Sequence, residues 1–323
     1  MKAAVLYKKH DLKIENLPIP IPNENEVLIK TSYCGVCGTD VHLYNGDEGS
    51  VKMTPLTIPG HEISGILVKT HEKVVVDPNY YCNTCFECIN NRPHYCENMK
   101  NTGVNIDGGF AQYLIADKSQ VHIIPQNVSL EEASFAEPIS CCLHGLDKIN
   151  INSSDNVLII GGGTIGLLML QLCKYFKVKS VGVVEIVENK RKTAALLGAE
   201  KVYNNVHDIK GESYNKVIEC VGLKQTCIEA IKVCANTGHV LFFGLTKPKE
   251  KIFINPFDLF KRDITITSSY INPYTIKKAL AILETKAINI APLIGNIYKL
   301  DKLKDVLENS DLRKNGKILI KLG

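Results

Sequence analysis

The sequence predicts an α/β protein in which a mostly β domain is followed by a doubly wound parallel sheet. Three observations carry this prediction. The chain has 323 residues, a length that suits two domains better than one. Roughly the first 145 residues are rich in Gly, Pro and short β-like runs, without a strong helical period. From Ile151 onward, short apolar runs alternate with helical stretches.

The N-terminal part reads as short strands joined by long loops. Apolar and β-branched residues cluster at Ala3–Tyr7, Glu26–Thr31 and Lys73–Val76, with Gly- and Pro-rich segments between them. Such clusters are typical of a β domain whose strands are connected by irregular segments.

The second part begins with a run typical of a strand buried on both faces, Asn156–Ile160. Glycines follow, and Thr164–Phe176 reads as a helix. Further strands are expected at Ser180–Ile186, Lys201–Tyr203, Lys216–Cys220, His239–Gly244 and Ile264–Thr267, and helices at Glu188–Leu197 and Lys224–Ala235. Six strands alternating with helices predict a complete dinucleotide-binding domain of the Rossmann type. Beyond it we expect helices at Pro273–Thr285 and Asp301–Asn309 and a final strand at Lys317–Leu322.

The turn between the first strand and helix of that domain fits G-x-G-x-x-G. Its residues are Gly161, Gly162, Gly163, Thr164, Ile165 and Gly166. In this context the glycines permit a tight turn, backbone approach to a pyrophosphate and close helix packing, although a turn needed only for packing is the alternative. Glu185 ends the second strand, where a carboxylate binds an adenosine ribose and repels a 2′-phosphate. This predicts NAD over NADP, and Lys190 and Arg191 nearby oppose the preference.

Four cysteines lie close together in C-N-T-C-F-E-C-I-N-N-R-P-H-Y-C, at positions Cys82, Cys85, Cys88 and Cys96. Four thiolates in a tetrahedral arrangement are the preferred ligands of a structural zinc ion. We therefore expect a closed zinc site that stabilises a lobe with little core of its own. A redox C-x-x-C pair or unrelated thiols are the alternatives.

A second metal site is indicated by separate pieces of sequence. Cys37 lies in C-G-V-C-G-T-D, His61 and Glu62 in P-G-H-E, and Glu137 in A-E-P. One thiolate, one imidazole and one carboxylate would hold a catalytic zinc and leave a fourth position for water or substrate. Taken singly, Cys34 and Cys37 could form a redox pair, and His61 could be an ordinary structural histidine.

Together these motifs resemble those of the zinc-dependent medium-chain alcohol/polyol dehydrogenases over essentially the whole chain. The resemblance is carried by C-G-V-C-G-T-D-V-H at 34–42, P-G-H-E at 59–62, the four-cysteine lobe, D-G-G-F-A-Q-Y at 107–113, A-E-P at 136–138 and the glycine turn. It implies a GroES-like catalytic domain, residues 1–148 and 286–323, and a Rossmann NAD-binding domain, residues 149–285. The C-terminal segment would then return to the first domain.

The resemblance also implies roles for individual residues. Cys37 and His61 match the zinc ligands of the family. The third ligand stays open between Glu62 and Glu137, which could exchange as substrate binds. The remaining matches are Asp40 to a carboxylate that orients the ligand histidine, Thr39 to the hydroxyl that takes the alcohol proton, and His42 to the surface end of a proton relay through the cofactor ribose.

The implied reaction is hydride transfer between an alcohol and NAD, with the alcohol made acidic by zinc. A-E-P-I-S-C-C-L-H-G at 136–145 and Y-I-N-P-Y-T at 270–275 look more like polyol, sugar-alcohol and butanediol dehydrogenases than like ethanol enzymes. We therefore expect oxidation of a secondary hydroxyl in a polyol to give a ketose. L-threonine 3-dehydrogenase is the nearest rival, and a sugar-alcohol phosphate is a further candidate substrate.

Two departures from the family pattern stand out. Gly65–Val76 is several residues shorter than usual between P-G-H-E and the four-cysteine lobe, which leaves the loop geometry open. Gly38 stands where some members carry an arginine that contacts the pyrophosphate.

Charge, hydrophobicity and cysteine content indicate which partners and which cellular location to expect. A net charge of +4 gives no reason to expect nucleic acid or an anionic membrane as partner. The N-terminal apolar stretch spans five residues, too few for a signal-peptide core, and glycines interrupt the apolar run at 157–173, so no membrane span is expected. Twelve cysteines without a secretion signal favour metal ligands and buried thiols in a cytoplasmic protein.

Two other function classes remain open. One is a non-catalytic protein that binds zinc and NAD structurally or as a redox sensor, and the other is an oxidoreductase that uses the thiols of Cys34 and Cys37. The resemblance further implies a homodimer or homotetramer that acts on a small-molecule alcohol or polyol.

Overall fold

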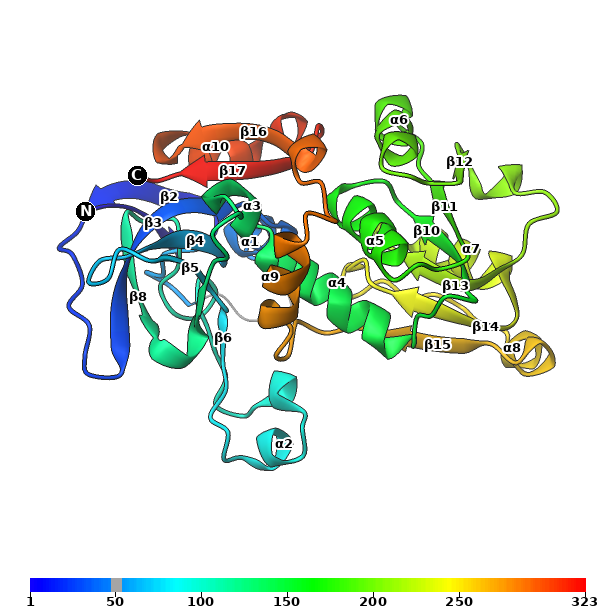
Figure 1. Cartoon of the computed structure of the whole chain (residues 1–323), viewed down its shortest axis with the longest axis horizontal. Coiled ribbons are helices and arrows are strands. Elements are labelled where there is room, and N and C mark those ends of the chain that lie inside the picture. The colour runs from blue at the N-terminus through cyan, green and yellow to red at the C-terminus, as the bar shows by residue number, and fades with distance from the viewer. Residues whose placement is uncertain (48–53) are drawn as a thin grey trace. The chain divides into compact units, whose positions relative to one another are not determined.

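The computed structural model describes residues 1–47 and 54–323, which form two compact units (Figure 1). The first unit comprises residues 1–140, 272–286 and 290–323, and the second comprises residues 141–271 and 287–289. The chain thus passes between units within α4 (Ala136–Lys148) and again just before α9 (Ile276–Glu284). These crossing points differ from the expected domain limits at 148/149 and 285/286.

The second unit contains the parallel sheet that the sequence predicts. Its described strands are β10 (Asn156–Ile160), β11 (Ser180–Val184), β12 (Lys201–Tyr203), β13 (Tyr214–Glu219), β14 (Cys234–Phe242) and β15 (Thr265–Ser268). They are ordered β12-β11-β10-β13-β14-β15, and each neighbouring pair is parallel. The strand order reverses between β10 and β13, which is where a doubly wound sheet binds its ligand.

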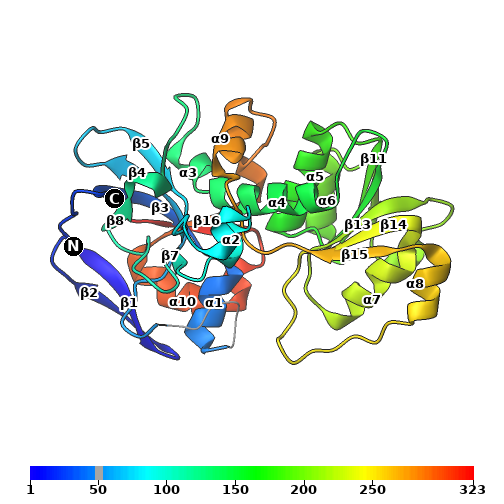
Figure 2. The ribbon, with the colours of Figure 1, turned by 90° about the horizontal axis from the view of Figure 1, so that it is seen from below.

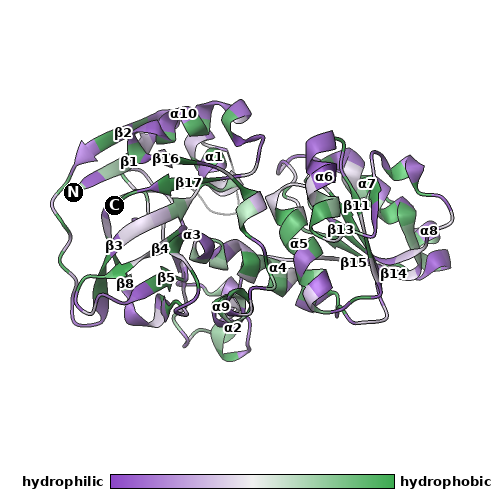
Figure 3. Cartoon of the chain, turned by 45° about the horizontal axis from the view of Figure 1, so that its top comes forward, coloured by the Kyte–Doolittle hydropathy of each residue, from purple (hydrophilic) through white to green (hydrophobic). Residues whose placement is uncertain are grey.

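Helices connect these strands, as a parallel sheet requires. They are α5 (Thr164–Tyr175), α6 (Glu188–Leu196), α7 (Lys224–Val233) and α8 (Pro256–Arg262), with a 3-10 turn at Val206–Asp208. Helix α5 is mostly hydrophobic and buries Gly166–Cys173, whereas α6 is mostly hydrophilic and buries Ala194 (Figure 3). The central helix of the unit is therefore fixed by burial on more than one face, which positions the glycine turn at its N-terminus.

The first unit is built on a mixed sheet whose strands come from both ends of the chain. The described strands are ordered β16-β17-β3-β4-β5-β9, and β8 also pairs with β3. Their bounds are β3 (Glu26–Gly35), β4 (Glu62–Leu67), β5 (Lys73–Val76), β8 (Tyr113–Asp117), β9 (Val121–Ile123), β16 (Ile294–Lys299) and β17 (Lys317–Lys321). Antiparallel pairing aligns Leu319 with Gly35 and Ile320 with Cys34, so the last strand of the chain lies beside the segment that leads to Cys37.

Smaller elements complete this unit. Two short ladders pair β1 (Lys2–Lys8) with β2 (Asp11–Asn16) and β6 (Asn79–Tyr80) with β7 (Lys100–Asn101). The described helices are α1 (Gly38–Asn45), α2 (Phe86–Ile89), α3 (Leu130–Ala133), α9 and α10 (Leu303–Glu308), with 3-10 turns at Pro93–Tyr95, Lys118–Gln120, Ala291–Leu293, Leu300–Lys302 and Ser310–Arg313. Helix α1 packs against α10 (Figure 2), and the Tyr44 hydroxyl donates to Glu308 Oε1 over 2.5 Å.

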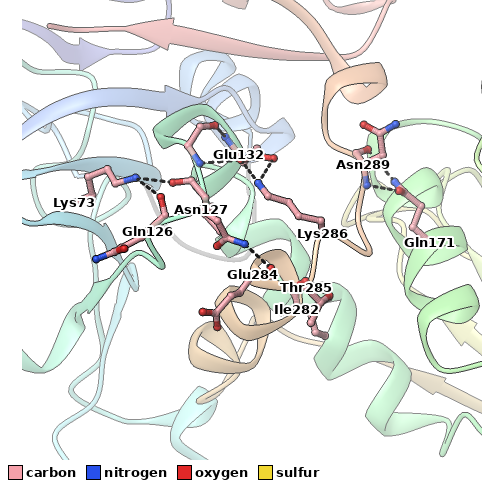
Figure 4. Close-up of polar contacts among 12 residues, drawn as sticks. Lys73, Gln126, Asn127, Glu132, Gln171, Ile282, Glu284, Thr285, Lys286 and Asn289 are labelled. Atoms are coloured by element: carbon pink, nitrogen blue, oxygen red, sulfur yellow. Dashed lines mark hydrogen bonds and ion pairs between the residues drawn. The ribbon is translucent and has the colours of Figure 1, made fainter.

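Polar contacts explain why α9 belongs to the first unit. Asn127 Nδ2 donates to the Glu284 carbonyl over 2.8 Å, and Lys286 Nζ lies 2.8 Å from both oxygens of Glu132 (Figure 4). Three residues further on, Asn289 exchanges hydrogen bonds with Gln171 of α5, which assigns residues 287–289 to the second unit. The chain therefore returns to the first unit earlier than the sequence indicated.

Helix α4 corrects one expectation, because no strong helical period was expected before residue 145. The segment contains Pro138, Ser140, two cysteines and Gly145, which are weak helix formers in a helix interior. Its hydrophobic residues Ile139, Leu143 and Leu146 are fully buried and recur at helical spacing. Packing thus overrides the poor local propensity, and the helix places Glu137 in its first turn.

The shortened stretch Gly65–Val76 forms a tight antiparallel hairpin of β4 and β5, with Ile66 aligned to Lys73. His71 adopts a φ of 62° in the connection, and its N–H donates to the Leu67 carbonyl over 2.9 Å. The shortening therefore affects the turn between β4 and β5, which follows His61 and Glu62 in the chain.

Across the residues described, no helix combines the length and apolarity needed to cross a membrane.

Candidate metal and cofactor sites

Helix α1 carries Thr39 and Asp40 at its start and His42 in its last turn. Cys37 is the N-cap, and its N–H donates to Asp40 Oδ2 over 2.8 Å, so the acidic residue of the first turn satisfies a free N–H of the helix end. Thr39 Oγ1 lies 3.8 Å from Cys37 Sγ. The C-G-T-D motif therefore folds into a helix start that points a thiol, a hydroxyl and a carboxylate into one region.

His61 and Glu62 stand where the P-G-H-E segment enters β4. Gly60 has a φ of +97°, and a Cβ there would lie 2.8 Å from Cys34 Sγ, so only glycine fits this turn. In the antiparallel ladder Glu62 lies opposite Gly35. A Cβ at Gly35 would lie 2.0 Å from Glu62 Oε2. The Glu62 carboxylate therefore occupies the space that a side chain at position 35 would take.

The ligand atoms of Cys37, His61 and Glu62 all lie within 4.8 Å of one another. His61 Nδ1, Glu62 Oε2 and Asp40 Oδ1 are buried, and no described group forms a hydrogen bond with them. Asp40 Oδ1 lies 3.7 Å from His61 Nδ1 and so faces the imidazole from that side. Buried polar atoms without partners are rare, and this set of sulfur, nitrogen and oxygen donors fits zinc.

The potential at this site favours a cation. Burial lowers the pKa of His61, but the Asp40 carboxylate and the Cys37 sulfur raise it well above its usual value. Glu137, at the start of α4, raises the pKa of the same imidazole, so its charge is felt at the site. The structure thus groups Cys37, His61 and Glu62, with Glu137 as an electrostatic neighbour.

Sequence reasoning missed Lys317. This lysine of β17 is buried and forms an ion pair with Glu62 through Nζ and Oε1. The signal in the sequence was a charged residue at the head of the apolar run K-I-L-I, which is unusual for a buried strand unless the charge is paired.

At Gly38, where some family members carry an arginine, a Cβ would meet nothing within 4 Å, so the space that the arginine would enter is open.

The four cysteines of the lobe also come together, with all four sulfurs within 4.8 Å of one another. Cys82 Sγ lies 3.5 Å from Cys96 Sγ and 4.0 Å from Cys88 Sγ. A tetrahedron with zinc–sulfur bonds of about 2.3 Å has edges of about 3.8 Å, so the spacing fits. Hydrogen bonds from Thr84 and from the N–H of Cys85 lower the pKa of Cys82 to about 5, which favours the thiolate that zinc requires.

The glycine turn has the geometry that its motif predicts. Gly161 adopts a φ of +106°, and a Cβ at Gly166 would lie 1.8 Å from the Gly161 carbonyl oxygen, so both positions demand glycine. Gly163 is the N-cap of α5, and a Cβ there would meet nothing within 4 Å, which leaves open space at the helix N-terminus. Thr164 and Ile165 begin that helix.

Glu185 follows the carboxyl end of β11 beside this turn. Its Oε2 accepts from the Gly162 N–H over 2.8 Å, and its Oε1 accepts from the Val187 N–H over 2.8 Å. Arg191 Nη1 donates to three oxygens, those of the Glu185 and Ile186 carbonyls and Asn204 Oδ1. The carboxylate is thus held next to the glycine turn, and the arginine is engaged by the loop.

Cys34 does not have the surroundings of a redox thiol. It is fully buried, and burial together with the charges of Asp40 and Glu62 raises its pKa well above the usual value. A reactive cysteine needs an accessible thiolate. The geometry therefore speaks against oxidoreductase chemistry by Cys34.

Two family models match the chain: one described as Alcohol dehydrogenase GroES-like domain over residues 23–126, and one described as Zinc-binding dehydrogenase over residues 164–285. The chain is 30% identical to D-arabinitol dehydrogenase 1 of Uromyces fabae, covering 99% of this chain and 97% of the relative. It is 34% identical to an L-threonine 3-dehydrogenase of Xanthomonas campestris over 72% of this chain and 73% of the relative. A crystal structure from Sinorhizobium meliloti, described as a zinc-binding dehydrogenase bound to NADP, superposes with a TM-score of 0.94 at 32% identity, covering 99% of this chain and 98% of that one.

Proposed function

We propose that this chain oxidises a secondary hydroxyl of a polyol or sugar alcohol to the ketone. The chain belongs to the zinc-dependent medium-chain alcohol and polyol dehydrogenase family. Its class, an NAD(P)-dependent zinc oxidoreductase, follows from that membership. The observation that carries the proposal is the group of Cys37, His61 and Glu62, whose ligand atoms converge beside the Thr39 hydroxyl, with His61 and Glu62 buried. The polyol assignment is supported by the likeness to the D-arabinitol enzyme over almost the whole chain.

When bound, zinc would supply Lewis-acid stabilisation of negative charge on the alcohol oxygen, and the nicotinamide cofactor would supply the hydride acceptor. Cys37, His61 and either Glu62 or Glu137 would hold the metal, and Asp40 would orient the imidazole from its Nδ1 side. The Thr39 hydroxyl takes the proton of the alcohol. His42, whose side chain is 39% exposed and whose Nδ1 lies 3.2 Å from Asp47 Oδ2, passes that proton to solvent. The four lobe cysteines would hold the second, structural zinc.

NAD is the proposed acceptor, with Gly161, Gly163, Thr164, Ile165 and Gly166 at its pyrophosphate and Glu185 at its ribose. The held carboxylate of Glu185 supports this choice, because it would lie against a 2′-phosphate. The related structure from Sinorhizobium meliloti is bound to NADP, so the choice needs its own test.

We expect Glu185→Gln to lower the ratio of kcat/KM with NAD to kcat/KM with NADP by about tenfold. The substitution keeps the shape of the side chain and removes the charge that repels the 2′-phosphate. Two like charges about 4 Å apart near a protein surface cost roughly 1–4 kcal/mol, and about 1.4 kcal/mol is a factor of ten. Glu188→Gln, at an exposed site in the first turn of α6, is the matched control. An unchanged ratio in Glu185→Gln would remove this residue from the specificity argument.

The function itself is tested by following NADH formation on zinc-loaded protein. The alcohols are sorbitol, xylitol, the arabitols, 2,3-butanediol, simple secondary alcohols, L-threonine and polyol phosphates, each also run with NADP. We expect a polyol with NAD to react fastest and His61→Ala to be inactive. Turnover of L-threonine alone would replace the polyol assignment with the second candidate, which the Xanthomonas campestris relative favours. Binding of zinc and NAD without any turnover would favour a non-catalytic protein.

We also propose that copies of the chain associate as a homodimer or homotetramer. Among the described strands β15 is an edge of the parallel sheet, and on the neighbouring α8 the side chains of Phe257 and Phe260 are 68% and 81% exposed. An open sheet edge beside exposed aromatic rings is typical of a surface that pairs with another chain. Light scattering after gel filtration measures this, and a monomer at micromolar concentration would contradict it. The grouping of Cys82, Cys85, Cys88 and Cys96 as metal ligands supports a cytoplasmic location, which cell fractionation tests.

A further inference from the structure

Lys317 and Glu62 form a buried ion pair directly beside the metal-ligand group. Their side chains are 9% and 1% exposed. Burying a lysine and a glutamate is unfavourable unless the two are paired, and removing one partner leaves the other uncompensated. Because Glu62 is also one of the two candidates for the third zinc ligand, its partner bears on the metal site.

The ion pair gives the two carboxylate oxygens of Glu62 different surroundings. Oε1 is held by the Lys317 ammonium, whereas Oε2 is buried and has no hydrogen-bond partner among the described groups. Gly35 leaves the space for this arrangement: a Cβ there would lie 2.0 Å from Oε2 and 3.0 Å from Lys317 Cε. The carboxylate is therefore confined, with Oε1 engaged by Lys317 and Oε2 without a partner among the described groups, and one of its oxygens lies within 4.8 Å of the ligand atoms of Cys37 and His61.

Lys317 also supplies a positive charge where acidic side chains gather. Its ammonium is paired with Glu62 Oε1, and the Asp40 carboxylate faces His61 in the same group. Loss of the lysine would leave the buried Glu62 carboxylate without its partner, so the position of this carboxylate depends on Lys317.

We propose that Lys317 is a positioning residue that restrains Glu62 to a weak, one-oxygen approach to the metal, so that a coordination position stays available to the substrate. The inference rests on the proposed zinc site. Without the lysine, both Glu62 oxygens would be free to bind the metal and would fill that position. With an arginine, whose planar fork engages both carboxylate oxygens, Glu62 would be withdrawn.

The test measures release of the catalytic zinc to a chromogenic chelator, with the lobe zinc as an internal reference. We expect Lys317→Met to release it about tenfold more slowly and to lose about tenfold in kcat, and Lys317→Arg to release it about tenfold faster, each tenfold being about 1.4 kcal/mol. Adding Glu62→Gln to Lys317→Met should return the release rate to near that of the parent. Lys321→Met, at an exposed site on the same strand, should change nothing.

A cobalt-loaded sample gives a second readout, because its visible absorption reports the number and kind of ligands without any turnover. We expect Lys317→Met and Lys317→Arg to shift this spectrum in opposite senses. Equal release rates in the parent and both variants, or shifts in the same sense, would overturn the proposal. If Lys317→Met does not fold, Lys317→Arg alone decides it, since unchanged release there contradicts the restraint. A protein that turns over no alcohol but shows these metal effects would lose the proposed function and keep this inference.

Discussion

Replacing His61 with alanine should reduce the zinc content from two ions per chain to one and lower kcat by about 10³-fold. The imidazole is one of three donors whose ligand atoms lie within 4.8 Å of one another, so alanine removes one protein ligand from the proposed site. Stabilisation by a catalytic metal is worth several kcal/mol, and about 1.4 kcal/mol is a factor of ten in rate. Metal analysis by mass spectrometry together with initial rates measures both effects.

Thr39→Val separates metal binding from proton transfer in the same region. We expect it to keep both zinc ions and lose about 10²–10⁴-fold in kcat, because the hydroxyl is the group that we propose takes the proton. His207→Ala, at an exposed histidine of the second unit, is the control and should keep both zinc ions and full turnover. The assignment fails if His61→Ala retains two zinc ions, or if Thr39→Val turns over at the rate of the parent.

The second large effect is expected at the lobe, where Cys88→Ser should remove the other zinc and lower the melting temperature by about 5–10 °C. The lobe consists of α2, a 3-10 turn and irregular segments, so metal binding free energy contributes directly to its folding. A loss of about 3 kcal/mol in a unit of roughly 190 residues, the size of the first unit, corresponds to such a shift. The lobe between Cys82 and Lys100 should also become a site of rapid proteolysis, which peptide mapping detects.

Cys173→Ser distinguishes loss of the metal from loss of a buried thiol. Cys173 is fully buried in α5, so serine should lower the melting temperature there too, but with two zinc ions bound and the lobe resistant to protease. If Cys88→Ser retained both zinc ions, the four sulfurs would not be the ligand set. A melting temperature equal to that of the parent after zinc loss would show that the ion is not needed for stability.

Much of the second unit could be predicted because several of its strands are nearly continuous runs of apolar residues. Asn156–Ile160 and Lys201–Tyr203 are strands with the bounds expected, and the glycine turn lies between the strand and helix that give it meaning. A strand covered on both faces selects a continuous apolar run, which local sequence displays directly. The two cysteine-containing motifs were equally readable, because zinc restricts its ligands to a few residue types.

Other features depend on contacts that sequence spacing does not reveal. Helix α4 is formed by weak helix formers that are buried, and α8 has no buried residue and so lacks an amphipathic pattern. Lys317 becomes meaningful only when β17 pairs with β3 and brings its ammonium to Glu62. Such pairings join distant parts of the chain, so no local window contains both partners.

The pairing of β17 with β3 also sets the order in which the molecule can be completed during synthesis. Glu62 and Lys317 are 255 residues apart, so at 5–20 residues per second the ribosome delivers the lysine roughly 13–50 s after the glutamate. In that interval the strands of the second unit all emerge, while the sheet of the first unit still lacks β16 and β17. A nascent chain therefore carries every described strand of the parallel sheet before Glu62 has met its countercharge, Lys317.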